Sequence, residues 1–341
     1  MHRTAHLCLT GLLLYGALLL SGCKSDPQLL EQRILQFGTV IDVSIIHQDT
    51  DKIEQGFVEV EKRLQIYRQY WHAWEESDLY RFNQGLTQPR PVLIPASLRE
   101  LIELSLDYYH TSQQLFNPAL GKLIAAYGFH SSQQADEALI ADIQQNLPTM
   151  LDLKISGTRA SSDNPHLQLD FGGIAKGYAM SLIADSLKTS GFEHFLINAG
   201  GDVLVAGNRF GKPWRIGIQN PFKPGAIASI NIAGDQHLFT SGNYQRYYQK
   251  EDAIVHHIID PRSGRPSKHI SSATVLTDDA VLADVAATTL MIDGWNNHRL
   301  LAKSLGIIDY LIINQNQEII VSQSMAEKIE FIGGIAYRVV D

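Results

Sequence analysis

Residues 169–179 read LDFGGIAKGYA and join an apolar run to a pair of glycines and then to a helix. The pattern predicts that this helix runs from about Ile174 to Leu187. Glycine permits positive φ and lets a backbone approach a ligand closely, and the free N–H groups at a helix start attract an anion. The spacing is neither that of the phosphate loop G-x-x-x-x-G-K-[ST] nor that of the dinucleotide motif G-x-G-x-x-G. The stretch is therefore either a routine strand-to-helix connection or a backbone cradle for an anionic ligand.

A second helix is predicted around residues 283–289, which read ADVAATT and are followed by Gly294. Asp284 and Thr288 are four residues apart, so on a helix they share one face. A carboxylate and a hydroxyl are hard oxygen ligands, which suit Mg²⁺ better than a soft metal. A solvated aspartate and a half-buried threonine would have the same spacing, so this pair is a candidate site only.

Between these stretches, residues 256–266 read HHIIDPRSGRP. The apolar residues beside His257 predict a short strand, and Asp260 to Gly264 have the composition of a tight turn. A histidine at a strand end can be partly exposed and titrate near neutral pH. His256 and His257 point to opposite faces of a strand, so at most one of them faces a given site. Ordinary surface or core histidines remain the alternative.

Two further motifs complete an ordered series: NAGGDV at residues 198–203 and TSGNYQRYY at residues 240–248. Together the series closely resembles the ApbE family of FAD:protein FMN transferases. WHAWEESDLYRFN at residues 71–83 resembles the flavin-side segment of that family, and the similarity extends from about Phe37 to the C-terminus. The resemblance implies an α+β fold with a mixed, largely antiparallel sheet core and flanking helices. It also implies one catalytic unit, with two lobes around a FAD cleft as one possible arrangement.

The resemblance also implies a reaction. The FMN half of FAD passes to a threonine or serine hydroxyl of a target protein with the help of Mg²⁺, forming a phosphoester and releasing AMP. Phosphoryl transfer depends on in-line positioning and charge stabilisation, and a hydroxyl nucleophile benefits from a general base. Two alternatives stay open: a Mg²⁺-dependent FAD pyrophosphatase that yields FMN and AMP, and a non-catalytic flavin-binding lipoprotein. A metal seat and a base argue against the second alternative, because binding alone requires neither.

Individual roles follow from the same resemblance. Asp284 and Thr288 are the implied side-chain ligands of Mg²⁺, and Gly173 is implied as a third ligand through its carbonyl. His257 is the implied base for the acceptor hydroxyl, which leaves His256 as a bystander. A broad aromatic surface suits an isoalloxazine ring, and Ile259 would act through its backbone. The implied FAD contacts are Phe37, Trp74, Leu115, Phe116, Asn117, Asp170, Lys176 and Ile259.

The chain departs from the usual family pattern at several positions. Phe37 replaces a common methionine, so a flexible thioether becomes a rigid ring. Asn117 and Asn243 replace common aspartates and keep hydrogen-bonding ability without the charge. Ala287 lacks a carboxylate that some relatives carry. These changes affect the expected flavin contacts and leave the metal pair and the base in place.

The N-terminus predicts export and lipidation. Arg3 precedes an uncharged apolar run from Leu7 to Leu20, which is short for a membrane span and well shaped for a signal peptide. Leu20-Ser21-Gly22-Cys23 looks like a bacterial lipobox, although an uncleaved apolar helix or a plain secretion signal would also fit. We therefore predict a signal peptide at 1–22, a lipidated Cys23 and tether at 23–35, and a single catalytic domain at 36–341. The expected location is the periplasmic side of a bacterial membrane, with the inner membrane preferred, since several acyl chains anchor a protein stably.

Charge and cysteine content narrow the partners. The chain has 341 residues and a net charge of −8, and removing residues 1–22, which contain Arg3 and no acid, makes it −9. That balance argues against nucleic acid and offers no basic patch for a membrane surface. Only Cys8 and Cys23 occur, so the mature domain has neither a disulfide nor a free thiol. The expected partners are FAD, the membrane through the lipid anchor and, by resemblance, periplasm-facing subunits of redox pumps such as Na⁺-pumping NADH:quinone reductase or Rnf complexes.

The remaining sequence predicts alternating helices and strands in an undivided chain. The clearest helix covers 51–67, where Ile53, Phe57, Val60 and Leu64 share one face. Other helices are predicted at 95–109, 118–127, 136–146 and 295–305. Strands are predicted at 37–47, 151–155, 167–171, 195–199, 203–206, 214–219, 227–232, 310–314, 318–321 and 331–332.

Overall fold

The structure is a computed structural model that describes residues 26–130, 135–250 and 253–341. The predicted signal peptide and Cys23 lie outside the described residues. Among the helices described, none is long and apolar enough to cross a membrane.

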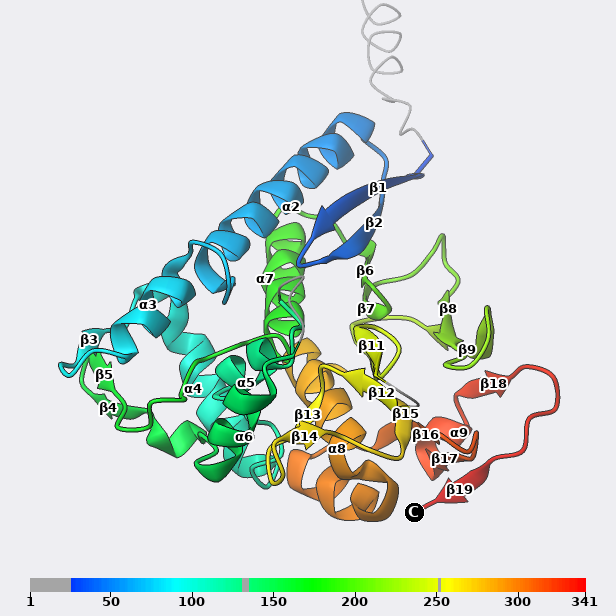
Figure 1. The fold of residues 1–341 in the computed structure, drawn as a ribbon. Coiled ribbons are helices and arrows are strands. Elements are labelled where there is room, and N and C mark those ends of the chain that lie inside the picture. Colours follow the sequence, from blue (N-terminus) through cyan, green and yellow to red (C-terminus); the bar gives the residue numbers. More distant parts are fainter. Residues whose placement is uncertain (1–25, 131–134, 251–252) are drawn as a thin grey trace, which may run out of the picture.

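A nine-stranded sheet forms the centre of the molecule (Figure 1). Its strand order is β1-β2-β6-β7-β10-β15-β16-β17-β19, and neighbours are antiparallel except for the parallel pair β17 and β19. The predicted mixed, largely antiparallel sheet is therefore confirmed. The strands are β1 (Gln28–Gln36), β2 (Thr39–His47), β6 (His194–Ala199), β7 (Asp202–Ala206), β10 (Gln236–Gly242), β15 (Ile270–Thr277), β16 (Asp309–Asn314), β17 (Ile319–Ser322) and β19 (Arg338–Val340).

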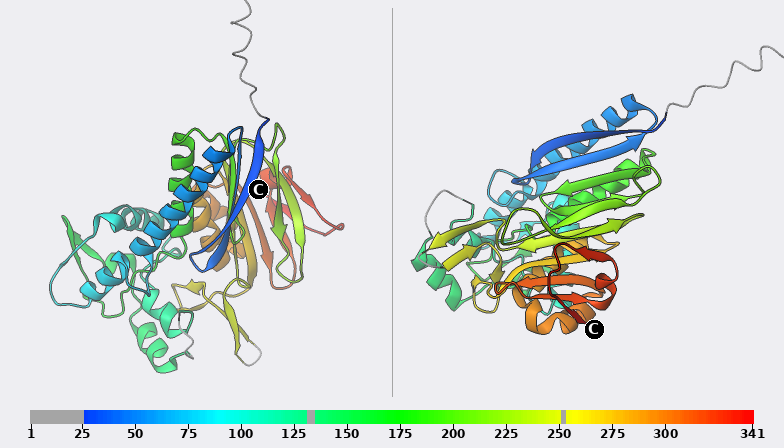
Figure 2. Two further views of the ribbon diagram at one scale, coloured as in Figure 1. Left: turned by 90° about the horizontal axis from the view of Figure 1, so that it is seen from above. Right: turned by 90° about the vertical axis from the view of Figure 1, so that its right-hand side faces the viewer.

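Both faces of this sheet are covered. Helices α2 (Thr50–Trp71), α7 (Ala175–Thr189) and α8 (Ala280–Leu305) pack on one face. A three-stranded sheet, ordered β18-β9-β8, packs on the other face through a separate apolar cluster (Figure 2). Because successive side chains of a strand point to opposite faces, every residue of β7 is buried. The outer strands are β8 (Trp214–Gln219), β9 (Ala226–Ile232) and β18 (Ile329–Phe331).

A helical part extends from the N-terminal half of the chain, beside α2 and α7 (Figure 1). Local capping explains several of its helix starts: the Ser77 side chain accepts a hydrogen bond from the Tyr80 N–H, and Asp136 accepts one from the Leu139 N–H. A small sheet, β3-β5-β4, lies at its edge. The elements are α3 (Asp78–Leu86), β3 (Val92–Leu93), α4 (Ala96–Thr111), α5 (Gly121–Ala126), α6 (Glu137–Gln145), the 3₁₀ helix η1 (Met150–Asp152), β4 (Lys154–Ser156) and β5 (Arg159–Ser161).

Short hairpins and a last helix complete the fold. Strand β11 (Tyr247–Lys250) pairs with β12 (Ala253–His256), and β13 (Ile259–Asp260) pairs with β14 (Arg265–Pro266). His257 therefore lies between two short strands. The apolar pattern had predicted a single strand there. Helix α9 (Gln323–Ala326) follows β17.

The N-terminal edge of the sheet differs from the sequence prediction. Residues 28–36, expected to belong largely to a tether, form β1 and pair with β2 along its whole length. Ile34 is buried, whereas Leu35 and its cross-strand partner Val40 are exposed. An edge strand that buries few side chains carries a weak alternation signal, and the polar residues at 31–33 conceal it further.

Three other predictions needed correction. Residues 167–171 are extended but form only an isolated bridge at Gln168. The Asn83 side chain donates to the Leu169 carbonyl and accepts from the Leu169 N–H, each at 2.9 Å, while the backbone of Gln168 and Asp170 bonds residues 118–121. The predicted strand at 151–155 begins as the 3₁₀ helix η1. The two helices predicted after residue 283 are joined in α8, which has non-helical φ/ψ at Asp293 and Asn297.

Candidate active site

The start of α7 is held by a carboxylate from another helix. Ile174, at the N-cap, makes no side-chain hydrogen bond to the helix. Instead, Asp284 of α8 accepts a hydrogen bond from the Gly177 N–H through Oδ2 at 2.9 Å. Because the first N–H groups of a helix lack partners within it, Asp284 supplies the cap that the local sequence does not. This contact joins the glycine-rich stretch to the predicted metal pair.

Gly177 allows the two helices to approach this closely. A Cβ at this position would lie 2.2 Å from the Ala280 carbonyl oxygen and 3.0 Å from the Asp284 Cβ. The first distance is far below van der Waals contact, and the obstacle is backbone that cannot rotate away. Gly177, the last glycine of the stretch, is therefore required by packing.

A buried charge cluster lies beside this crossing. The Lys176 Nζ contacts the Asp202 carboxylate and lies 3.5 Å from Asp284 Oδ1. Asp202, at the start of β7, also accepts a hydrogen bond from the Thr240 N–H at 3.0 Å. Both carboxylates are 2% exposed, so two buried acids face one ammonium group. The cluster therefore carries excess negative charge.

The pKa values of the cluster follow from its geometry. Burial, together with the nearby charge of Asp284, raises the pKa of Asp202 to about 6, although Lys176 opposes the shift. Burial alone would lower the pKa of Lys176, but the two carboxylates outweigh it and raise that pKa. Lys176 therefore stays charged at neutral pH. A further cation near Asp284 would relieve the repulsion between the acids.

Thr288 lies one helical turn after Asp284, as predicted, and faces the same region. Its Oγ1 lies 3.2 Å from the Ser241 Oγ of β10. A Cβ on Gly173 would lie 3.4 Å from the same Thr288 oxygen and 3.2 Å from the Phe116 ring. Gly173, Phe116 and Thr288 thus meet at the start of α7. The structure brings together the glycine stretch, the α8 pair and one of the expected flavin-side aromatics.

This donor set fits Mg²⁺ in its chemistry. Mg²⁺ prefers oxygen ligands and usually keeps water or substrate phosphate in several positions. Asp284, the Thr288 hydroxyl and the Gly173 carbonyl are all oxygen donors, and the excess negative charge of the cluster favours a cation. Within the described part of the chain, no three His, Cys, Asp or Glu side chains are grouped as a metal site. A metal at this place would therefore depend on the hydroxyl, the carbonyl and the substrate as well as on the carboxylate.

His257 lies in the connection between β12 and β13. Its Nδ1 donates a hydrogen bond to the Arg246 carbonyl at 3.3 Å, because a carbonyl oxygen can only accept. That tautomer leaves the Nε2 lone pair free. Burial and the positive charge of Arg246 lower the pKa of His257 to about 3, and Lys176 contributes in the same direction. His257 is therefore neutral at pH 7 and able to accept a proton.

The β1–β2 turn reaches the same place. The Arg246 guanidinium donates to the Phe37 carbonyl at 3.2 Å. Phe37 has a positive φ of 53°, and its side chain packs partly buried against the helix-side core. A small pocket beneath it is lined by Phe37, Thr39 and Lys176 together with apolar residues of α2, α7, β2 and β6. The expected flavin contacts Phe37 and Lys176 therefore share one pocket.

Trp74 and Asp170 are linked through a histidine. The His130 ring stacks on Trp74, with ring centroids 4.0 Å apart and planes 16° apart. His130 Nε2 lies 3.5 Å from Asp170 Oδ2, and the Gly172 N–H donates to Asp170 Oδ1 at 2.9 Å. Burial alone would raise the pKa of Asp170, but these partners lower it. Asp170 is therefore ionised at the glycine turn.

The remaining expected contacts have packing roles in the structure. Leu115 is buried in the apolar cluster beneath α8, and Ile259 is buried in a cluster with residues of α5 and α6. The Asn117 side chain donates to the Pro148 carbonyl at 2.9 Å and accepts from the Ala119 N–H at 3.1 Å. His256 is 1% exposed, and its Nε2 hydrogen-bonds the Ser267 carbonyl at 2.9 Å. His256 therefore stabilises its own loop and does not face the site.

Four residues of this region had no role predicted from the sequence: His130, Asp202, Ser241 and Arg246. Three of them lie in the ordered motifs, since Asp202 belongs to NAGGDV and both Ser241 and Arg246 belong to TSGNYQRYY. A buried acid directly after paired glycines was the available signal for Asp202. His130 had no such signal, because only the fold brings it onto Trp74. Together, the anion-facing helix start, the oxygen donors and the neutral histidine define a site suited to phosphoryl transfer.

Comparison with known proteins agrees with this class of site. The ApbE family model matches residues 37–312. A FAD:protein FMN transferase of Rhodobacter capsulatus is 31% identical over 333 residues, which are 95% of this chain and 64% of that relative. One of Vibrio cholerae is 29% identical over 297 residues, which are 82% and 86% of the two chains. The chain thus spans less than two thirds of the length of the Rhodobacter relative and most of the Vibrio one.

Solved structures give the same result. The flavin transferase ApbE from Vibrio cholerae has a TM-score of 0.77 at 26% identity, covering 89% of this chain and 100% of that one. The chain belongs to the ApbE family. The family and the ApbE-like α+β fold expected from the ordered motifs are therefore confirmed.

Proposed function

We propose that this chain transfers the FMN half of FAD to a threonine or serine hydroxyl of another protein, in a reaction that uses Mg²⁺. The chain is a FAD:protein FMN transferase, as its ApbE relatives are named. The Mg²⁺ requirement, the residue roles, the acceptor and the cellular location are inferences that rest on the contacts of this chain and on its motifs.

One observation carries the residue assignment: Gly173, Asp284 and Thr288 converge at the start of α7. The positive end of the helix dipole favours the pyrophosphate of FAD at such a place. Asp284, Thr288 and the Gly173 carbonyl would hold Mg²⁺, and Lys176 would face the phosphates with a fixed charge. Bound there, Mg²⁺ supplies neutralisation of the pyrophosphate charge.

His257 would take the proton from the acceptor hydroxyl. The hydroxyl oxygen forms a bond to the phosphorus on the FMN side, and the bond from that phosphorus to the bridging oxygen breaks. AMP leaves with the bridging oxygen, and the proton passes to His257 Nε2 and then to solvent. The Nδ1 hydrogen bond to the Arg246 carbonyl fixes the ring for this role.

The flavin end would lie toward Trp74, Phe37 and Asp170. Trp74 offers an aromatic face at the edge of the helix-side core, although the His130 ring covers one of its faces. Ile259 would contribute its backbone. Phe116 and Leu115 border the glycine turn and the α8 cluster, while Asn117 shapes their loop through its own hydrogen bonds.

The deciding experiment supplies FAD, Mg²⁺ and a candidate acceptor, and follows flavin fluorescence on a denaturing gel. We expect a fluorescent acceptor band, with AMP released in equal amount. Release of only free FMN and AMP would instead identify a FAD pyrophosphatase, since water would then have replaced the acceptor hydroxyl. Mass spectrometry of the labelled band would identify the acceptor residue.

The location is proposed from the sequence. Cleavage after residue 22 and lipidation of Cys23 would hold the domain of residues 36–341, with β1 before it, on the periplasmic side of a membrane, preferably the inner one. Periplasm-facing subunits of membrane redox pumps, such as Na⁺-pumping NADH:quinone reductase or Rnf complexes, would then be within reach as acceptors. Loss of palmitate labelling and of membrane association in Cys23→Ser would support this, and an unchanged membrane fraction would contradict it.

A further inference from the structure

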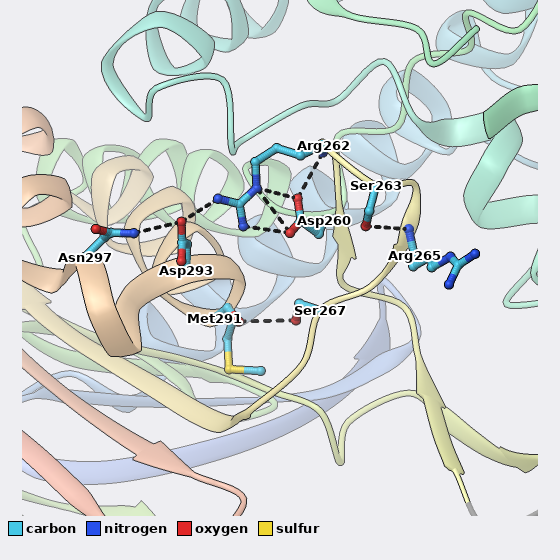
Figure 3. A network of polar contacts seen from close by, with 8 residues as sticks. All are labelled: Asp260, Arg262, Ser263, Arg265, Ser267, Met291, Asp293 and Asn297. Atoms are coloured by element: carbon cyan, nitrogen blue, oxygen red, sulfur yellow. Dashed lines mark hydrogen bonds and ion pairs between the residues drawn. The ribbon is translucent and has the colours of Figure 1, made fainter. Parts of the chain in front are cut away.

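The loop that carries His257 is fastened to the helix that carries Asp284 and Thr288. We call residues 256–267 the histidine loop. The Ser267 Oγ donates to the Met291 carbonyl at 3.2 Å, and the Arg262 Nη1 contacts Asp293 Oδ2 at 2.5 Å (Figure 3). Met291 and Asp293 lie three and five residues after Thr288. Both attachments are therefore within about one and a half helical turns of Thr288.

Arg262 occupies the centre of this connection. Its Nε and Nη2 bind the Asp260 carboxylate at 2.7–3.2 Å, and its own N–H donates to Asp260 Oδ1 at 2.9 Å. Nη1 is then directed at Asp293 on the far side of the guanidinium (Figure 3). A planar fork can hold two carboxylates in this fixed relation, whereas a lysine ammonium has no such geometry.

The attachment point on α8 is itself a special place. Asp293 and Asn297 leave helical φ/ψ there, and the Asn297 side chain donates to the same Asp293 oxygen at 3.0 Å. Sharp kinks require a local cause, and this one keeps the Asp293 carboxylate turned toward Arg262. The straight part of α8 before the kink carries Asp284 and Thr288. The contact between Arg262 and Asp293 thus fixes the histidine loop relative to the part of α8 that carries Asp284 and Thr288.

The Arg262 contacts contribute little to folding stability. The Arg262 side chain is 55% exposed, against 18% for Asp260 and 20% for Asp293. Ion pairs with an exposed partner typically contribute about 0–1 kcal/mol. The buried brace of the loop is elsewhere, in His256 and Ser267, which hydrogen-bond each other and α8. Arg262 therefore fixes the position of the histidine loop relative to α8 and adds little to stability.

We propose that Arg262 is a positioning residue, which ties Asp260 to Asp293 and so keeps His257 at a set distance from Asp284 and Thr288. This inference rests on the proposed transfer reaction. A misplacement of about 1 Å can cost about a hundredfold in rate when the reacting groups must be aligned. Arg262 acts on the reaction through His257 and does not touch the substrate.

The test compares Arg262→Gln, Arg262→Lys and Asp293→Asn with the unmodified protein in the transfer assay. We expect kcat to fall about tenfold or more for Arg262→Gln and Asp293→Asn, with less loss for Arg262→Lys, while the KM for FAD and the Tm hardly change. The double variant Arg262→Gln/Asp293→Asn should be no slower than Arg262→Gln alone, because Arg262→Gln already removes the contact with Asp293. Lys188→Gln is the control, since Lys188 also pairs with a carboxylate, that of Asp235 at 3.0 Å, and lies at the opposite end of α7 from the site.

A second comparison separates positioning from general structural damage. In a His257→Ala background, Arg262→Gln should cause no further loss of kcat, because the residue it positions is already gone. An unchanged kcat in Arg262→Gln, or an equal further loss in the His257→Ala background, would overturn the inference. If the unmodified protein releases AMP without labelling any acceptor, the proposed transfer fails, and the same comparisons made on AMP release still decide the role of Arg262.

Discussion

Replacing Asp284 separates two roles that the structure gives to one carboxylate. Oδ2 caps α7 at Gly177, and Oδ1 faces Lys176 and the predicted metal position. Asp284→Asn keeps an oxygen that can accept the Gly177 N–H but removes the charge. Asp284→Ala removes both. The two variants should therefore differ in stability and agree in their loss of metal-dependent activity.

The expected magnitudes follow from these contacts. Loss of a helix cap costs about 0.5–2 kcal/mol, so Asp284→Ala should unfold at lower urea concentration than Asp284→Asn. Metal-assisted charge stabilisation contributes several kcal/mol, and about 1.4 kcal/mol corresponds to a tenfold rate change. Loss of one charged ligand should then reduce Mg²⁺-dependent transfer by about 10²–10³ in both variants.

Acceptor flavinylation should be measured by in-gel fluorescence over a Mg²⁺ titration, with urea unfolding of the same preparations. If either variant keeps near-wild-type transfer without added metal, Asp284 is not a metal ligand. If Asp284→Asn is as unstable as Asp284→Ala, the cap interpretation is wrong, because the asparagine oxygen would have failed to replace the carboxylate.

Three further predictions concern neighbours of this site. Desolvation and the charge of Arg246 lower the pKa of His257 to about 3, so at saturating Mg²⁺ kcat/KM should stay level as pH falls from 8 to 6 and decline only in stronger acid. A decline centred near 6.5 would contradict this. Gly177→Ala places a Cβ 2.2 Å from a carbonyl oxygen and should lower the free energy of unfolding, measured in urea, by about 1–3 kcal/mol. Gly217→Ala, whose Cβ would have its nearest contact at 3.4 Å, should leave that free energy nearly unchanged. Asp202→Asn should free Lys176 to pair with Asp284, where it would compete with Mg²⁺. The Mg²⁺ concentration for half-maximal transfer should then rise about tenfold, and an unchanged Mg²⁺ dependence would refute this competition between Lys176 and Mg²⁺.

The sequence predicted the parts of the fold that bury a continuous apolar face. The helix at 51–67 was recognised from Ile53, Phe57, Val60 and Leu64, all of which are buried in α2. The strands at 214–219 and 227–232 were recognised in the same way. Strand β1 was missed because an edge strand with one exposed face has little pattern to detect. Residues 167–171 were misassigned because the Asn83 side chain of α3, 86 positions earlier, satisfies the backbone of Leu169, and only residues 118–121 bond their other backbone groups.

The candidate site was predicted only as far as its motifs extend. The i,i+4 spacing placed Asp284 and Thr288 on one face of a helix, and the structure bears that geometry out. The Asp284 contact with Gly177 joins residues 107 positions apart, and no local pattern announces it. The same holds for His130 on Trp74 and for Arg246 on Phe37. These contacts depend on the packing of α7 on α8 and of a hairpin against the β1–β2 turn, which a single sequence does not reveal.

Strand β1 begins at Gln28, only five residues after Cys23. Five residues span at most about 18 Å, however they are arranged. The nine residues of β1 then cover about 30 Å to the turn at Phe37. If Cys23 is lipidated as we propose, the turn at Phe37 could lie no more than about 50 Å from the bilayer. Strand β1 would then limit how far from the membrane an acceptor hydroxyl can lie and still be flavinylated.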